Sequence, residues 1–424
     1  MTVLRIARAT LVFCLLGVWL ACGEYYRPVA TPIIPTPPKP GFSNVALVIT
    51  GNGDNNPGAS TTIDVSGDTA ISQSTVGLVP VHAALVQSAT LVYVANSHED
   101  TVSEFGPSSP APVTTISLPA GSTPSFVATT ESGTVYVANS GSGTVVAISV
   151  GNNVIANTIP VGVNPVTMAE LPNGQKLYVA NKGSGGRNGS VSSINTIDKI
   201  PNPPVSGAWI SPVWVVVRSD GQRAYVLDSG TGNVSAIDTY TDIVTSNVAV
   251  GVGADFMLYD PVLDRLYVTN PATNQVIVLD ASSDSLPATP VALANPVALA
   301  ALPDGTRAYV SSAAVKASAS GNLVGSQVTV LNTADLSVKT TIPLTTVESV
   351  PGCALKTWSE LFMAASADST RVYVGNCDAG NTAIIDTSND TLIVQLASPV
   401  SAQKPARNGG TPPPQNPVFV LAGP

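Results

Sequence analysis

Charged side chains are scarce in this chain of 424 residues. They make up 11% of the sequence, about half of the usual share. Long amphipathic helices need more Lys, Arg and Glu on their outer faces, so a mainly helical fold is disfavoured. The 18 Lys and Arg residues form no cluster and are outnumbered by 27 Asp and Glu residues, which gives a net charge of −9. Because no basic cluster is present to neutralise phosphates, this composition argues against nucleic acid as a partner.

The residues that most often carry chemistry are also few. Only two histidines occur, His82 and His98, and a haem, copper or zinc centre generally needs more imidazole or thiolate ligands than this. The sequence has no Gly-x-Ser-x-Gly elbow, no phosphate-binding glycine loop and no His-x-x-Glu-His-like spacing. We therefore expect no cofactor and no enzyme activity.

What the chain has in abundance is the material of strands and turns. Gly and Pro contribute 35 residues each, well above the average share. Short runs rich in Val, Thr, Ile and Ser are broken by Gly, Asn, Asp and Pro. This composition is typical of β-strands joined by tight turns, so an all-β fold is expected.

The N-terminus has the pattern of an export signal. Arg5 and Arg8 precede an apolar run of 13 residues, 9–21, which is too short for a comfortable membrane span. The run ends in Leu-Ala-Cys-Gly, which resembles the lipobox of bacterial lipoproteins with Cys22 as the lipidated residue. Trp19 departs from the Leu that this pattern prefers, and an ordinary cleaved signal peptide is the alternative. The resemblance implies an exported protein that is lipid-anchored to the bacterial outer membrane or cell surface, in the periplasm or outside the cell.

A proline-rich segment follows Cys22. Such a segment favours an extended polyproline geometry and suits a tether that holds a domain away from a membrane. We expect a signal peptide over 1–21, a tether over 22–42 and a folded domain over 43–424, with the lipid anchor as the only contact with the membrane.

The folded domain repeats a Tyr-Val pair. Successive pairs are separated by 43, 42, 47, 42, 42 and 64 residues, and a period near 42 is typical of four-stranded propeller blades. In each repeat a strand led by Pro comes first (strand A), then a turn such as Leu-Pro-Asn-Gly, then the Tyr-Val strand (strand B), then two further strands (C and D). The pairs begin at Tyr93, Tyr136, Tyr178, Tyr225, Tyr267, Tyr309 and Tyr373.

Turns between strands C and D carry a second signature. Asp238 to Asp242, Asp280 to Asp284, and Asp386 to Asp390 are Asp-x-x-x-Asp segments that follow a run of aliphatic residues. Asp suits such turns because its carboxylate accepts hydrogen bonds from nearby backbone N–H groups.

These motifs resemble a known repeat family. The Tyr-Val-Ala-Asn and Tyr-Val-Thr-Asn tetrads at 93–96, 136–139, 178–181 and 267–270, with the Ile-Asp strand ends and Pro-Asp-Gly-like turns, are similar to the YVTN family of β-propellers, whose members occur on bacterial and archaeal surfaces and in the periplasm. The resemblance covers about 44–424 and implies a propeller fold more than an activity. It implies that the Tyr packs between blades and that the polar residue after the tetrad's Val-Ala or Val-Thr bonds to loop backbone.

The two ends of the folded domain complement each other. Residues 416–424 read as a strand A with nothing behind it, whereas 45–53, 60–68 and 70–78 read as strands B, C and D with no strand A before them. Joining them completes an eighth blade and removes exposed sheet edges. We expect an eight-bladed propeller of four-stranded antiparallel blades; seven blades is the alternative.

Several loops depart from the repeat. Insertions lengthen several of the B–C and D–A loops, which emerge on the same face of a propeller. They lie near 187 and at 314–326, 343–361 and 404–417. Binding sites on repeat scaffolds commonly lie where insertions gather, so we expect contacts with protein or glycan on this face.

The topology also brings two cysteines together. Cys353 lies in a D–A loop and Cys377 in the following B–C loop. In an oxidising compartment we expect them to form a disulfide; two free thiols are the alternative.

A few polar residues remain as candidates for a site. His82, Glu170 and Arg218 fall on or at the end of strands A and could line the central channel, although solvated channel charges are the simpler interpretation of the last two. His98, Glu99 and Asp100 form a loop cluster that could bind Ca²⁺ together with nearby carbonyls, although a plain exposed loop is the simpler interpretation.

The sequence favours a non-catalytic, monomeric scaffold or binding lipoprotein of the cell envelope. The alternative is a propeller hydrolase or lyase, lactonase-like, with its site in the central channel. Few histidines and paired carboxylates fall on the A strands, which counts against that alternative.

Overall fold

The structure, a computed structural model, describes residues 45–86, 90–107, 113–130, 133–313, 315–316, 323–344, 361–400 and 414–423. The expected signal peptide (1–21) and tether (22–42) lie outside these ranges. Lys39–Pro424 forms one compact unit. No helix among the described residues is long and apolar enough to cross a membrane.

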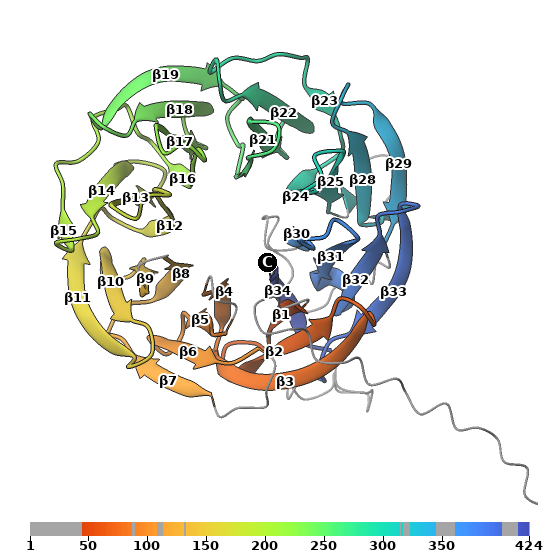
Figure 1. The fold of residues 1–424 in the computed structure, drawn as a ribbon, viewed down its shortest axis with the longest axis horizontal. Coiled ribbons are helices and arrows are strands. Elements are labelled where there is room, and N and C mark those ends of the chain that lie inside the picture. The colour runs from red at the N-terminus through yellow and green to blue at the C-terminus, as the bar shows by residue number, and fades with distance from the viewer. Residues whose placement is uncertain are drawn as a thin grey trace, which may run out of the picture. The chain divides into compact units, whose positions relative to one another are not determined.

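The described residues form eight four-stranded antiparallel sheets arranged in a ring, which confirms the eight-bladed propeller (Figure 1). Each sheet is one blade, with strand A innermost and strand D at the rim. Blade 1 consists of β34 (Asn416–Ala422), β1 (Val45–Gly51), β2 (Pro57–Asp64) and β3 (Thr69–Leu78); blade 2 of β4 (Pro80–Leu85), β5 (Val92–Asn96), β6 (Thr101–Phe105) and β7 (Thr114–Ser117); blade 3 of β8 (Pro124–Thr129), β9 (Thr134–Asn139), β10 (Thr144–Ser149) and β11 (Val154–Pro160); and blade 4 of β12 (Pro165–Glu170), β13 (Lys176–Asn181), β14 (Ser190–Asn195) and β15 (Ile200–Pro201).

The second half of the ring repeats the same order. Blade 7 also carries a small hairpin, β26 (Val315–Lys316) and β27 (Leu323–Val324), between its strands B and C, and the short 3-10 helix η2 (Cys377–Ala379) follows strand B of blade 8. Blade 5 consists of β16 (Pro212–Val217), β17 (Arg223–Asp228), β18 (Asn233–Asp238) and β19 (Ile243–Ala249); blade 6 of β20 (Phe256–Asp260), β21 (Arg265–Asn270), β22 (Gln275–Asp280) and β23 (Val291–Ala292); blade 7 of β24 (Pro296–Ala301), β25 (Arg307–Ser312), β28 (Gln327–Asn332) and β29 (Val338–Pro343); and blade 8 of β30 (Met363–Ala365), β31 (Arg371–Asn376), β32 (Asn381–Asp386) and β33 (Thr391–Ala397).

Burial explains the two kinds of strand in the sequence. Strand B of blade 3, β9, is buried along its whole length because both of its faces meet neighbouring blades. Strand D of blade 5, β19, alternates between exposed and half-buried residues because it lies at the rim. Continuous apolar runs and alternating runs therefore mark middle and outer strands respectively.

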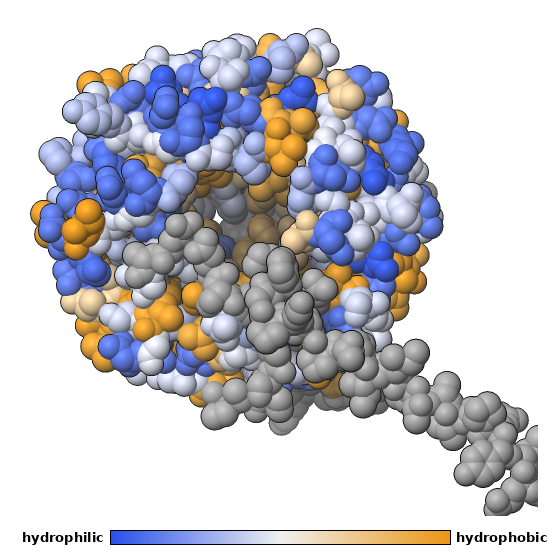
Figure 2. Space-filling model, in the orientation of Figure 1, coloured by the Kyte–Doolittle hydropathy of each residue, from blue (hydrophilic) through white to orange (hydrophobic). Residues whose placement is uncertain are grey.

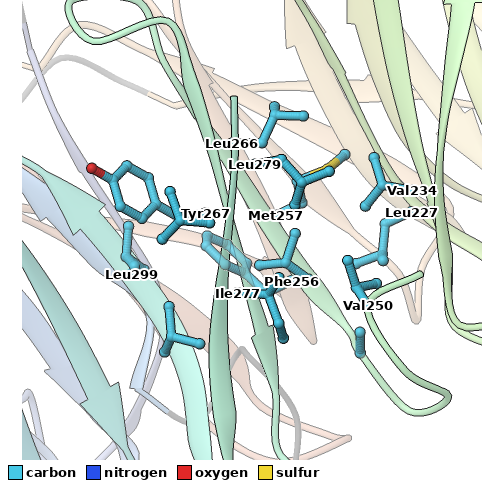
Figure 3. Packing of buried hydrophobic residues seen from close by; sticks show 14 of the residues in the cluster. Leu227, Val234, Val250, Phe256, Met257, Leu266, Tyr267, Ile277, Leu279 and Leu299 are labelled. Carbon is cyan, nitrogen blue, oxygen red and sulfur yellow. The ribbon is translucent and has the colours of Figure 1, made fainter. Parts of the chain in front are cut away.

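Hydrophobic clusters fill the spaces between blades. One cluster joins Leu227 and Val234 of blade 5, Met257 and Leu266 of blade 6, and Leu299 of blade 7 (Figure 3). Each blade thus buries its faces against two neighbours, which is why a single blade could not be stable alone.

The termini close the ring as the sequence predicted. Strand β34 pairs with β1 in antiparallel register, with Leu47 opposite Leu421 and Val48 opposite Val420. Figure 1 shows the first and last strands side by side in one blade. The blade is therefore built from both ends of the folded domain, and no strand of it is left as an open inner edge.

The repeated tyrosines link one blade to the next. All seven are at most 1% exposed, and four of their hydroxyls donate to the C–D turn of the following blade, at a residue with positive φ. Because that acceptor is an Asp or Asn side chain, packing between blades is combined with a directional bond. The pairs are Tyr93 with Asn153 at 3.1 Å, Tyr178 with Asp242 at 2.5 Å, Tyr225 with Asp284 at 2.9 Å, and Tyr309 with Asp390.

Basic residues on the same strands strengthen these links. The Nζ of Lys176 lies 3.0 Å from Asp242, and the guanidinium of Arg307 lies 2.5 Å from Asp390. Arg371 makes the equivalent contact with Asp68 of blade 1, at 3.0 Å. We call each such set of Tyr, basic residue and turn carboxylate an interblade latch.

The polar residue at the end of strand B serves its own loop in some blades. Asp228 accepts the backbone N–H groups of Gly230 and Thr231, and Asn270 accepts that of Thr273, so both bond to the backbone of the B–C loop that follows them. Asn96 instead donates to the hydroxyls of two residues on strand C of its own blade.

Candidate functional site

The innermost strands carry one residue per blade at the same register of their pairing with strand B. In six blades this residue follows a β-bulge, where one residue after the leading proline is skipped in the pairing with strand B. A bulge redirects the side chain that follows it. The eight residues at this register are Phe419, His82, Phe126, Thr167, Trp214, Phe256, Ala298 and Phe362, for blades 1 to 8.

Six of these eight residues carry a ring, and the rings touch one another in sequence. We call this set the aromatic arc. The centroids of neighbouring rings are 3.7 to 6.0 Å apart, within or close to the usual range for aromatic pairs. The contacts run from Phe126 to His82 (3.7 Å), Phe419 (4.1 Å), Phe362 (4.3 Å), Phe256 (6.0 Å) and Trp214 (4.7 Å).

Two pockets adjoin the arc. The first, which we call the channel pocket, measures about 360 Å³ and is bounded by inner strands of blades 5, 6, 7, 8 and 1, including Trp214, Phe256, Phe362 and Phe419. All of its lining residues are apolar. Inner strands of five blades meet only around the axis of the ring, so this pocket is part of the central channel; Figure 2 shows the ring hollowed at its centre.

The second pocket, the Glu170 pocket, measures about 520 Å³ and lies against blades 2, 3 and 4. Phe126 and Met168 contribute apolar surface, and Thr129 and Glu170 contribute polar groups. Both pockets include residues next to the A–B turns, such as Pro172 and Pro303. Both pockets therefore extend to the end of the ring that carries the A–B turns.

His82 belongs to the arc. It is 6% exposed, its ring stacks on Phe126 and makes a tilted contact with Phe419, and its Nδ1 accepts the backbone N–H of Val127 at 3.5 Å. Burial lowers the pKa of His82 to about 3, although the bond from Val127 opposes this shift. The imidazole is therefore neutral near pH 7 and acts as another ring in the wall.

The two charged candidates on strands A differ in their surroundings. Glu170 is half-buried and lines the second pocket. Arg218 instead lies between blades, where its guanidinium contacts Asp264 at 2.5 Å and Asp220 at 3.2 Å. The hydrogen bond from Arg218 lowers the pKa of Asp264. Arg218 thus links blades 5 and 6.

The loop cluster of His98, Glu99 and Asp100 also has local roles. Asp100 accepts the backbone N–H groups of Gly121 (2.7 Å) and Thr123 (2.6 Å) from the next D–A loop. Glu99 accepts the hydroxyl of Thr101 at 2.8 Å. Within the described ranges no group of three or more His, Cys, Asp or Glu side chains is arranged to hold a metal ion.

Only one of the two cysteines of the expected disulfide lies among the described residues. Cys377 is 4% exposed and begins η2, whereas Cys353 lies outside the described residues. The lengthened loops at 343–361 and 404–417 also fall largely outside them. The pairing of Cys353 with Cys377 and a binding site on that face stay predictions.

A third pocket lies on the outer part of the ring between blades 4 and 5. This blade 4–5 groove measures about 680 Å³ and is formed by A–B and C–D turns of both blades. The latch of Lys176, Tyr178 and Asp242 lies beneath it, and Tyr240 at its rim is 94% exposed. Burial and the neighbouring carboxylate of Asp242 raise the pKa of Tyr178 above its usual range. Among the groove's polar side chains are Asn173, Gln175, Asn195 and Asn202.

Sequence reasoning placed His82 on an inner strand but missed the arc and the groove. The signal for the arc was present, because Phe126, Trp214 and Phe419 each stand two residues after the proline of a strand A. Aligning inner strands rather than Tyr-Val strands would have found it. The groove carries no comparable signal, since Tyr240 occupies an ordinary turn position.

Comparisons with known proteins agree on the fold. No family model matches the chain, and no curated protein matches it either. Among solved structures, the chain is similar to apo AztD from Citrobacter koseri (TM-score 0.61, 10% identity, 89% of this chain and 96% of that one). It is also similar to the dihydro-heme d1 dehydrogenase NirN in complex with DHE (TM-score 0.62, 12% identity, 92% and 78%). A third similar structure is a candidate 6-phosphogluconolactonase from Bacteroides fragilis (TM-score 0.54, 14% identity, 90% and 99%). At these identities the likeness shows the propeller fold alone.

Proposed function

We propose that this protein is a non-catalytic binding propeller of the cell envelope, and that the blade 4–5 groove binds a glycan. The observation that carries the proposal is Tyr240, whose side chain is 94% exposed at the rim of a groove with several amide side chains. A tyrosine ring has apolar faces and a polar hydroxyl, so an exposed Tyr beside a pocket offers a ligand both a stacking surface and a hydrogen-bonding group.

The chemistry of the groove suits a sugar better than a peptide. A phenol ring offers a flat apolar face for the C–H side of a pyranose, while amides such as those of Gln175 and Asn202 offer donors and acceptors to hydroxyls. Lys176 and Asp242 line the base of the groove and pair with each other at 3.0 Å, so their charges offset one another. The groove therefore has no unpaired charge from this pair to offer, which fits an uncharged stretch of a glycan.

A glycan array with bacterial envelope polysaccharides tests this proposal. We expect full-length protein to bind, Tyr240→Ala to bind about tenfold more weakly from loss of one stacking contact of roughly 1.4 kcal/mol, and Tyr240→Trp to retain binding. Ile71→Ala, at another exposed apolar residue of the rim, is the matched control and should bind normally. Absence of glycan binding, or co-purification of one envelope protein that depends on Tyr240, would show that the groove serves another partner.

The membership in the YVTN family and the lipid anchor are part of the same proposal. The tetrads and the lipobox-like sequence around Cys22 support them. We expect labelled palmitate to be incorporated into the wild-type chain and not into Cys22→Ser. Equal labelling of both would reject the anchor and leave the ordinary signal peptide.

A channel hydrolase or lyase is the second candidate, because Glu170 places a carboxylate in an open pocket of about 520 Å³. The state of His82 weighs against it, because a buried imidazole with a pKa of about 3, in contact with the rings of Phe126 and Phe419, is a poor general base near neutral pH. Lactone hydrolysis by the purified protein that disappears in Glu170→Gln would favour the enzyme over the binding protein.

A further inference from the structure

We propose that the glycan of the blade 4–5 groove carries N-acetylated amino sugars, and that Gln175 and Ile197 recognise the acetamido group. This inference rests on the proposed function and narrows it from glycans in general to one class of sugar. Three features of the groove carry it: an exposed apolar side chain that the blade fold does not require, a side-chain amide open to a ligand beside it, and a charge balance that favours a neutral substituent.

Ile197 occupies a position of the C–D turn where other blades carry small residues. It stands two residues after the end of strand C in blade 4, as Tyr240 does in blade 5, and the two line the same groove. They are 68% and 94% exposed, so both surfaces are available to a ligand. A large apolar side chain is not needed for the turn, because the five other C–D turns that the structure describes in full have Ser, Gly or Ala there. These residues are Ser66, Gly151, Ser282, Ala334 and Ser388.

Gln175 lies next to this turn. Its backbone carbonyl accepts the N–H of Thr196, the residue before Ile197, at 3.2 Å. Gln175 is exposed and lines the groove, and its side-chain amide makes no hydrogen bond with any described residue. The amide of Asn195 is by contrast engaged within its turn, where its oxygen accepts the N–H groups of Ile197 and Asp198. The groove therefore places an open amide beside an exposed aliphatic side chain.

An acetamido group matches these two side chains in a single substituent. Either its carbonyl oxygen or its N–H can pair with the amide of Gln175, while its methyl group can cover Ile197. A sugar hydroxyl can pair with the amide as well, but it gains nothing from an aliphatic surface. The ring of Tyr240 can stack on the C–H face of a pyranose of either kind. Ile197 is therefore the residue that distinguishes acetylated amino sugars from plain sugars.

Charge distinguishes the acetylated sugar from the free amino sugar. The charged residues that line the groove are Lys176 and Asp242, and they pair with each other at 3.0 Å. A protonated amino group in the groove would meet a carboxylate whose charge Lys176 already offsets, and it would lose hydration on binding. An acetamido group is neutral and carries no such cost, so the groove favours the N-acetylated form.

Calorimetric titration of the full-length protein with two tetrasaccharides tests the inference. Tetra-N-acetylchitotetraose and cellotetraose share one β-1,4-linked backbone and differ only in the acetamido or hydroxyl group at C2 of each ring. We expect the acetylated sugar to bind at least about tenfold more tightly, from one covered methyl group and one hydrogen bond. Ile197→Ser should weaken its binding about fourfold and leave cellotetraose binding unchanged. Gln175→Ala should weaken binding of the acetylated sugar about fivefold.

Val154→Ser and Gln222→Ala are the matched controls for Ile197→Ser and Gln175→Ala. Val154, which is 57% exposed, follows the C–D turn of blade 3, and Gln222 is the exposed equivalent of Gln175 in the A–B turn of blade 5; neither lines the groove. Both should bind like the wild type. If the two tetrasaccharides bind equally well, or if either groove variant binds the acetylated sugar as tightly as its control, the inference is overturned while the proposed glycan site stands. If neither tetrasaccharide binds, the inference is overturned, and the glycan array shows whether the proposed function fails with it.

Discussion

The latch between blades 7 and 8 offers the sharpest test of how the ring is held together. The side chain of Asp390 is 1% exposed, and its carboxylate contacts Arg307 at 2.5 Å and Lys339 at 2.6 Å. The hydroxyl of Tyr309 also donates to it. Replacing Asp390 by Ala would leave the buried phenol of Tyr309 without its acceptor, and would leave the guanidinium of Arg307, which is 15% exposed, with the backbone carbonyl of Thr387 but no carboxylate.

The size of the effect follows from this burial. Removing one partner of a buried ion pair costs about 3–5 kcal/mol, because the other charge is left uncompensated. Lys339 adds little, since its side chain is 45% exposed and can return to water. We therefore expect Asp390→Ala to lower the free energy of unfolding by about 3–5 kcal/mol, and Asp390→Asn, which keeps an acceptor, to lower it by less.

Asp386 provides the control from the same turn. Its side chain is 27% exposed and its carboxylate lies 3.8 Å from Arg371. The same carboxylate accepts the backbone N–H of Ser388, a contact within its own turn. Loss of such a local contact costs about 1 kcal/mol. Urea denaturation of the two alanine variants, followed by fluorescence and circular dichroism, measures the difference. If Asp390→Ala is no less stable than Asp386→Ala, the latch does not hold the blades together and the reasoning is refuted.

Three further predictions concern the channel, the closure and the loops. His82→Phe introduces the phenyl ring that four other blades carry at this register. Because the pKa of His82 is about 3 in the folded protein against an ordinary value of 6.5, the wild type should lose stability as pH falls from 6.5 toward 3, by up to about 1.36 kcal/mol per pH unit more than the variant. Equal dependence of the free energy of unfolding on pH in the two proteins would contradict this. Val420→Asp, at a residue with 0% exposure, should detach β34 from β1, and the exposed edge of β1 should then produce oligomers that light scattering detects. A stable monomer would contradict the closure of the ring by β34. Non-reduced peptide maps should contain a linked Cys353–Cys377 peptide, and its absence would reject the disulfide.

The blade count could be predicted from the sequence because the Tyr-Val strand is buried in every blade that carries it. Tyr136 and its equivalents fill a large buried space between blades, and four of the seven also donate a hydroxyl hydrogen bond to the next blade, so the motif changes little from repeat to repeat. The closure was equally accessible, since a lone strand A at 416–424 and lone strands B to D at the start can be satisfied only by each other. The blade count and the closure both follow from strands that need a partner at an edge or a neighbour on a face, and the sequence pattern indicates such strands directly.

The candidate sites were harder to predict because they depend on contacts between repeats. Phe126 and Phe419 lie far apart in the chain, yet the rings of both contact His82. Their adjacency exists only once blades 1, 2 and 3 stand next to one another. Arg218 shows the reverse case: its position at the end of a strand A suggested the channel, but the turn of the following blade places Asp264 close enough to pair with it.

The Asp-x-x-x-Asp turns show why local reasoning reaches only part of such a structure. The first Asp, as in Asp238, accepts the N–H groups of its own turn, as expected. The second, as in Asp242, takes a positive φ and accepts the tyrosine and lysine of the preceding blade. Two Asp residues four positions apart therefore make different contacts: the first stabilises its own turn, and the second bonds to the neighbouring blade. Where the second position is Leu336, no carboxylate reaches Tyr267 from that turn, and Arg265 donates instead to the backbone carbonyl of Thr333. The Asp that makes the contact between blades is thus part of the repeated motif, but only the assembled ring shows which tyrosine of the preceding blade it accepts a hydrogen bond from.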